Sequence, residues 1–151
     1  MAPIILASSS PRRQEILKLL NIPFQVIIPN TDETITQGFS PEEASELIAR
    51  QKISEIIHSK PMGQEIPWIL SADTIILFNG KLYGKPQSHE EAFNFLKEFQ
   101  GKSHEVLTSI VLYNGKTKET VSKTCRTKVT FAKMSDEEIQ WYLDTGEWHG
   151  A

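Results

Sequence analysis

The sequence has 151 residues, a formal net charge of -3 at pH 7 and an apolar content of 39%. This length and composition predict a single globular domain spanning residues 1–151, with enough apolar side chains to form a core. The Lys and Arg residues are scattered and show no basic excess, which argues against duplex nucleic acid as a partner.

Cysteine content and hydropathy narrow the protein class further. A single cysteine, Cys125, excludes an internal disulfide and a cysteine-based zinc site, and we expect it to be a half-buried thiol in a strand. No apolar run is long enough to span a membrane, and the N-terminus lacks the pattern of a secretion signal. A cytoplasmic location with no membrane partner is therefore expected.

The N-terminal residues predict a strand, a tight turn and a helix. Residues 4–7 form a short apolar run, and Ser10 and Pro11 are typical of the first positions of a helix. The helix that follows has Ile16, Leu17 and Leu20 on one face, which we expect to be buried.

Arg12 and Arg13 fall in the first turn of this helix, where the helix dipole disfavours each cation by about 0.3–1 kcal/mol. No neighbouring residue in the sequence compensates these charges. A phosphate group docked on the turn would do so, because backbone N–H groups, serine hydroxyls and two guanidinium groups all bind such an anion. Arginines that point into solvent are an equally good interpretation of this stretch alone.

The remaining elements are predicted from caps, hairpin turns and periodicity. In chain order these elements are a strand at 24–28, a helix from Ser40 to about Ser59, strands at 68–78 and 81–83 around an Asn79-Gly80 turn, a helix after Ser88 ending at Gly101, strands at 104–113 and 120–132 around an Asn114-Gly115 turn, and a helix after Ser135 ending at Gly146. His104 begins the strand at 104–113, where it could be a ligand or a base but is more simply explained as a satisfied edge residue. Helices interleaved with two hairpins predict an α/β domain with a mixed sheet.

Asp73 is the strongest single-residue signal. It lies in the middle of the apolar strand at 68–78, where a carboxylate is costly unless it is hydrogen-bonded, paired or bound to a metal. Satisfaction by backbone N–H groups at a bend in the strand is the alternative. We favour a functional role.

Three weaker signals accompany Asp73. Glu33, next to Asp32 in a loop, is suited to a divalent cation, although such acidic pairs are usually only solvated. Lys52 lies on the edge of an apolar helix stripe, where its ammonium either meets an anion or extends into water. Lys85 follows the first hairpin and is carried back toward Asp73. Carboxylates together with cations and an N–H-rich turn predict metal-assisted hydrolysis of a nucleotide.

Several motifs, in order along the chain, resemble those of the Maf family of nucleoside triphosphate pyrophosphatases. The resemblance implies an α/β fold like that of inosine-triphosphate pyrophosphatases, with an elongated mixed sheet flanked by helices and two lobes around a cleft. It also implies a divalent cation (Mg²⁺, Mn²⁺ or Co²⁺) and hydrolysis of a nucleoside triphosphate to monophosphate and pyrophosphate. The motifs are residues 6–13 (LASSSPRR), 32–33 (DE), 49–52 (ARQK), 72–74 (ADT), 84–86 (GKP), the turn at 101–104, Tyr142 and residues 145–147 (TGE).

The resemblance also implies roles for individual residues. Asp73 would accept a proton and, together with Glu33, hold the metal. The residues expected to bind the phosphates are Ser8, Arg13, Lys52 and Lys85.

Arg12 and Thr74 resemble the branch of the family that acts on dTTP and UTP, whereas another branch has Ser-Pro-Trp-Arg and Ser-Asp-Gln and acts on 7-methyl-GTP. A third specificity position, in an Ala-Gly-Ala-Tyr-x-Ile-Gln-Gly motif, lies beyond Ala151, so we expect a chain truncated at its C-terminus relative to the family. The alternatives to an enzyme are a nucleotide-binding module without catalysis and an interaction protein. A homodimer is one option for the assembly.

Overall fold

The computed structural model describes residues 3–31, 38–61, 63 and 65–145. The predicted order of strands and helices is confirmed, with small differences at element ends. The elements are β1 (Ile4–Ala7), α1 (Pro11–Leu19), β2 (Phe24–Val26), α2 (Pro41–Ser59), β3 (Ile69–Phe78), β4 (Lys81–Tyr83), α3 (His89–Phe99), β5 (Ser103–Tyr113), β6 (Thr120–Thr130) and α4 (Asp136–Asp144).

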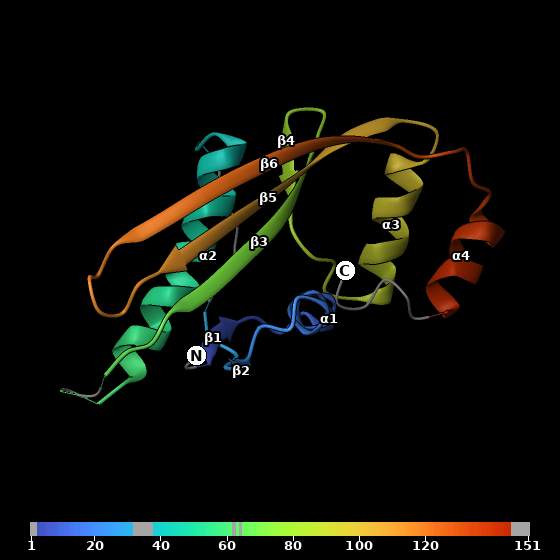
Figure 1. Cartoon of the computed structure of the whole chain (residues 1–151). Helices are drawn as coiled ribbons and strands as arrows, with labels where there is room; N and C mark the ends of the chain where they lie inside the picture. Colours follow the sequence, from blue (N-terminus) through green and yellow to red (C-terminus); the bar gives the residue numbers. More distant parts are fainter. Residues whose placement is uncertain (1–2, 32–37, 62, 64, 146–151) are drawn as a thin grey trace.

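The strands form one mixed sheet in the order β2-β1-β3-β5-β6, with β4 also paired to β3 (Figure 1). β1 runs parallel to β2 and β3, whereas β5 is antiparallel to both β3 and β6. The long strands β3, β5 and β6 cross the length of the molecule in Figure 1. This arrangement confirms the predicted mixed α/β fold.

Helix α2 covers one face of the sheet and forms the larger core with it. Ser40 caps the helix by accepting a hydrogen bond from the Glu43 N–H at 3.1 Å, and Pro41 occupies the first turn. Its apolar residues then pack against β1, β3 and β5. The buried members of this cluster are Ile5, Ala7, Ala49, Ile53, Ile56, Ile69 and Val111.

A second group of contacts lies at the other end of the long strands. Phe78, Tyr83 and Phe99 form an aromatic cluster between β3, β4 and α3, with ring centroids 5.0–5.2 Å apart. Ile139 and Leu143 of α4 pack against Ala92 of α3, and the two helices lie next to each other in Figure 1. The two groups of contacts agree with the predicted two lobes, while a single domain over residues 1–151 stays a prediction.

Three expectations about burial are wrong. Ile16 and Leu20 are 55% and 62% exposed, so that Leu17 alone of the three is buried. Cys125 is exposed rather than half-buried. The reason is its position in β6, an edge strand of the described sheet that is exposed along most of both faces.

Candidate active site

The site lies at a break in the pairing of β3. On one edge, residues Ile69–Ser71 pair with β1 and residues Ile76–Phe78 pair with β4. Residues 72–75 between them have no strand partner on that edge in the described part of the chain, whereas β5 pairs with β3 continuously on the other edge. In α/β sheets, ligands usually bind in the crevice that forms where two neighbouring strands diverge.

A cleft of about 640 Å³ opens at this break. Its walls come from the end of β1, from α2, from β4 and from the loop that follows β4. The lining residues include Ser8, Ser9, Thr31, Ile48, Lys52, Asp73, Thr74, Leu82, Lys85 and Gln87. The volume suits a ligand of nucleotide size.

Lys52 and Asp73 form a buried ion pair in the cleft. Their side chains are 6% and 11% exposed, and Lys52 Nζ lies 3.7 Å from Asp73 Oδ1. Lys52 Nζ also donates a hydrogen bond to the Ala72 carbonyl at 3.0 Å. Lys52 is therefore held inside the molecule by an anion and a carbonyl, and does not extend into water.

Arg13 is held by partners far away in the sequence. Its Nη1 donates to Ser8 Oγ at 3.2 Å and to the Ala72 carbonyl at 3.1 Å, and its Nη2 donates to Thr74 Oγ1 at 3.3 Å. Two of these partners lie on β3, 59 and 61 residues away, so they could not be seen from the residues that neighbour Arg13 in the sequence. Because Lys52 donates to the same Ala72 carbonyl, one peptide group at the break in β3 positions two cations.

The turn between β1 and α1 is organised by Ser8. The Ser8 side chain is 2% exposed, and its Oγ accepts hydrogen bonds from both the Ser10 N–H and Arg13. Ser10 occupies the N-cap position but makes no side-chain capping bond. The helix N-terminus therefore keeps the N–H groups that an anion could use.

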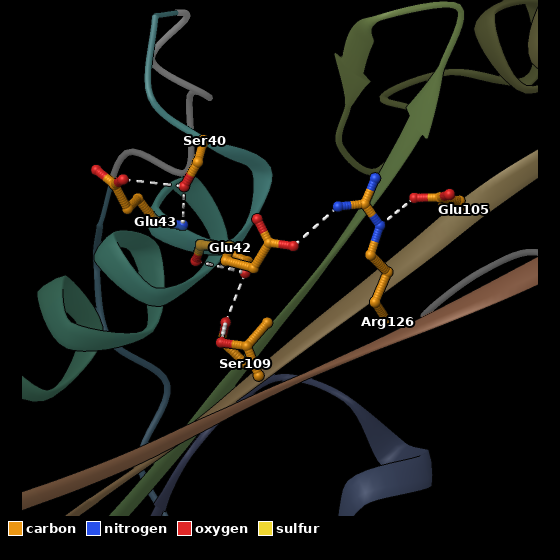
Figure 2. A network of polar contacts seen from close by, with 8 residues as sticks. Ser40, Glu42, Glu43, Glu105, Ser109 and Arg126 are labelled. Atoms are coloured by element: carbon orange, nitrogen blue, oxygen red, sulfur yellow. Dashed lines mark hydrogen bonds and ion pairs between the residues drawn. The ribbon is translucent and has the colours of Figure 1, made fainter.

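Polar contacts fix α2 against the sheet beside the cleft (Figure 2). Ser45 Oγ lies 2.5 Å from Ser109 Oγ, which lies 2.7 Å from Thr124 Oγ1, and Ser109 is the cross-strand neighbour of Asp73. Nearby, Arg126 of β6 binds both Glu42 of α2 and Glu105 of β5. Sequence reasoning missed these residues because cross-strand register cannot be read from spacing.

Comparison with known proteins identifies the family. The sequence model described as "Maf-like protein" matches residues 3–151. This chain belongs to the Maf family, whose members are nucleoside triphosphate pyrophosphatases. The recognition made from the sequence motifs is therefore confirmed.

Curated relatives of this Maf chain share a name. A protein of Bacillus velezensis is 38% identical over 95% of this chain and 73% of its own length, and is named dTTP/UTP pyrophosphatase. A protein of Halalkalibacterium halodurans with the same name is 42% identical over 97% of this chain and 74% of its own length. Among solved structures, protein VC0702 from Vibrio cholerae matches 98% of this chain and 71% of its own, at 10% identity and a TM-score of 0.47.

The fold brings together five of the predicted site residues. Ser8, Lys52, Asp73 and Lys85 line one cleft, although Lys85 lies on its exposed rim. Thr74 also lines it. Arg13 lies behind Ser8 and Thr74 and is not a lining residue, and Arg12 is exposed on the helix surface. Glu33 lies outside the described residues.

Maf proteins typically use a divalent metal ion, and the described residues fit one in part. The cleft offers the Asp73 carboxylate, a hard oxygen donor, whereas the hydroxyl oxygens of Ser8 and Thr74 already accept hydrogen bonds from Arg13. Within the described ranges, no cluster of three or more His, Cys, Asp or Glu residues could bind a metal by itself. This donor set suits Mg²⁺, which usually binds one or two carboxylates and takes further oxygens from water and substrate phosphates.

No helix in the described part of the chain combines the length and apolar character that crossing a membrane requires.

Proposed function

We propose that this Maf chain hydrolyses nucleoside triphosphates, with dTTP and UTP as its substrates, to the monophosphate and pyrophosphate. The observation that carries the proposal is the buried Lys52–Asp73 pair at the break in β3, inside a cleft of nucleotide size. A buried carboxylate beside a buried ammonium supplies both a proton acceptor and a phosphate ligand. The shared name of the relatives supports the choice of pyrimidine substrates.

The cations act on the phosphates. Lys52 of α2 and Lys85 of the loop after β4 both line the cleft, and Arg13 donates hydrogen bonds to the lining residues Ser8 and Thr74. Negative charge builds up on the pyrophosphate leaving group, and fixed cations stabilise it without reorganising. The Ser8 turn, at the N-terminus of α1, supplies N–H groups for the same anion.

Asp73 acts as the proton acceptor. Its carboxylate takes a proton from the water that attacks the α-phosphorus, and Lys52 keeps the carboxylate oriented toward the cleft. Asp73 and Glu33 are also the residues that would hold Mg²⁺, Mn²⁺ or Co²⁺. The ion, when bound, polarises phosphate oxygens and neutralises their charge.

Arg12 and Thr74 select the base in this proposal. Thr74 lines the cleft, and its hydroxyl can hydrogen-bond an exocyclic group of the base. A cytoplasmic location and a homodimer also remain proposals; light scattering of the purified chain tests the second.

One substrate panel tests the proposal. The purified chain is incubated with each nucleoside triphosphate and Mg²⁺ or Mn²⁺, and released pyrophosphate is measured. We expect turnover of dTTP and UTP above that of the other nucleotides. Binding without turnover would instead indicate a nucleotide-binding module, and neither binding nor turnover would indicate an interaction protein.

Asp73→Asn is the decisive variant in this panel. It should abolish pyrophosphate release and leave the far-UV circular dichroism spectrum unchanged. Asp144→Asn, whose side chain is 66% exposed on α4 and does not line the cleft, is the matched control and should retain full activity. Full activity of Asp73→Asn would remove this carboxylate from the mechanism.

A further inference from the structure

A chain of side-chain contacts leads from the cleft into β5. Arg13 Nη2 donates to Thr74 Oγ1 at 3.3 Å, and Thr74 Oγ1 lies 3.0 Å from Thr108 Oγ1. Thr108 is the direct cross-strand partner of Thr74 in the β3–β5 register. Thr108 does not line the cleft, so any effect it has on a ligand passes through Thr74.

Hydrogen-bond capacity limits what the Thr74 hydroxyl can do. A threonine hydroxyl has one proton and two acceptor positions, and a guanidinium can only donate. The bond from Arg13 therefore occupies one acceptor position of Thr74 Oγ1. If Thr108 donates as well, both acceptor positions of Thr74 Oγ1 are filled. The Thr74 hydroxyl can then make a further hydrogen bond only by donating its own proton.

We propose that Thr108 is a positioning residue that donates to Thr74 and thereby makes the Thr74 hydroxyl a hydrogen-bond donor toward the nucleobase. The proposal rests on the proposed function, in which Thr74 contacts the base. In the opposite arrangement, with Thr74 donating to Thr108, one lone pair of Thr74 would face the ligand.

The direction of the hydrogen bond between Thr108 and Thr74 decides whether the site favours uracil and thymine or cytosine. Uracil and thymine carry a carbonyl oxygen at position 4, which only accepts, whereas cytosine carries an amino group there, which donates. A Thr74 hydroxyl with both acceptor positions occupied can pair with the carbonyl but not with the amino group. Thr108 would thus favour UTP and dTTP over CTP without contacting any of these nucleotides.

The test compares Thr108→Val, which keeps the shape but lacks the hydroxyl, with Thr108→Ser, which keeps the hydroxyl. The kcat/KM values for UTP and CTP are measured for each variant, together with the melting temperature. Loss of one hydrogen bond of ordinary strength should lower the UTP-to-CTP ratio by about 3- to 10-fold in Thr108→Val. Thr108→Ser should keep the wild-type ratio within about twofold.

Thr130→Val is the matched control, because Thr130 also pairs with a cross-strand hydroxyl, Ser103 Oγ at 2.8 Å, away from the cleft. It should leave the ratio unchanged. If Thr108→Val does not fold, Thr108→Ala takes its place. An unchanged ratio in the folded variant, or an equal loss in Thr108→Ser, overturns the role of Thr108 while the proposed function stands.

Measurements on the wild-type protein separate a failure of the role of Thr108 from a failure of the proposed function. Turnover of UTP and CTP at equal rates would refute the role of Thr108 and leave the hydrolase activity intact. No pyrophosphate release from any nucleotide would refute the proposed function, and the role of Thr108 with it.

Discussion

Replacement of Lys52 by Met tests whether the buried ion pair holds the cleft together. Methionine keeps an unbranched apolar stem of similar size but removes the ammonium 3.7 Å from Asp73 and the hydrogen bond to the Ala72 carbonyl. Breaking a fully buried pair costs about 3–5 kcal/mol. Because both side chains face a cleft that water can enter, we expect a smaller loss of about 2–3 kcal/mol in the free energy of unfolding.

A double-mutant cycle separates the charge effect from lost packing. In the wild-type background, Asp73→Asn removes a carboxylate that is paired with the Lys52 ammonium. In the Lys52→Met background, the same change removes a carboxylate that no longer has this ammonium beside it. Asp73→Asn should therefore restore about 1–2 kcal/mol in the Lys52→Met background, and should not do so in wild type. Urea unfolding followed by circular dichroism gives all four free energies.

The same substitution at Lys97 is the control for this cycle. Lys97 pairs with Asp136 at 3.4 Å, but the side chains are 57% and 64% exposed, so Lys97→Met should cost less than about 1 kcal/mol. Equal effects of Asp73→Asn in both backgrounds, within about 0.5 kcal/mol, would refute the coupling between Lys52 and Asp73.

Three further predictions concern stability. Burial lowers the pKa of His104 below its usual 6.5, so the folded state binds fewer protons than the unfolded state. The stability of the fold therefore falls as the pH drops from 6.5 through the folded pKa. Melting curves at pH 7.5 and 5.5 should show a smaller decrease in melting temperature on acidification for His104→Phe than for wild type. Ser135→Ala removes the reciprocal capping box of α4 and should cost about 1 kcal/mol in urea unfolding; no measurable cost would contradict the role of the cap. Gly115→Ala places a Cβ 1.7 Å from the Ile66 carbonyl oxygen and should lower the melting temperature more than Gly80→Ala, which meets nothing within 4 Å although its φ is +74°; the reverse order would show that φ strain dominates.

Local signals predicted the elements well, because caps and hairpin turns act over a few residues. Ser40, Ser88 and Ser135 each accept the expected N-terminal hydrogen bond, and Asn79-Gly80 joins β3 to β4. Asp73 could be singled out for a similar reason, since a carboxylate within an apolar strand needs an explanation wherever the strand is placed.

The failures have one physical cause, which is that tertiary contacts decide burial and pairing. The partners of Arg13 in β3 are 59 and 61 residues away, so its compensation is invisible in the local sequence. Thr108 was missed because its link to Thr74 depends on the β3–β5 register. His104, interpreted as a satisfied edge residue, is 4% exposed and packed between Phe99 and Phe131, and its Nδ1 has no hydrogen-bond partner among the described residues.

The exposed edge strand β6 has a consequence for behaviour at high protein concentration. Within the described residues, the outer edge of β6 has no strand partner over its 11 residues, and such an edge is a template on which a second copy could add its own edge. Lys123 and Lys128 lie along this strand, so two copies meeting edge to edge would bring like charges together. Salt weakens such repulsion once the Debye length falls to about 3 Å near 1 M. The colloidal stability of this protein should therefore decline as ionic strength rises, and Lys-to-Val changes in β6 should bring that decline to lower salt.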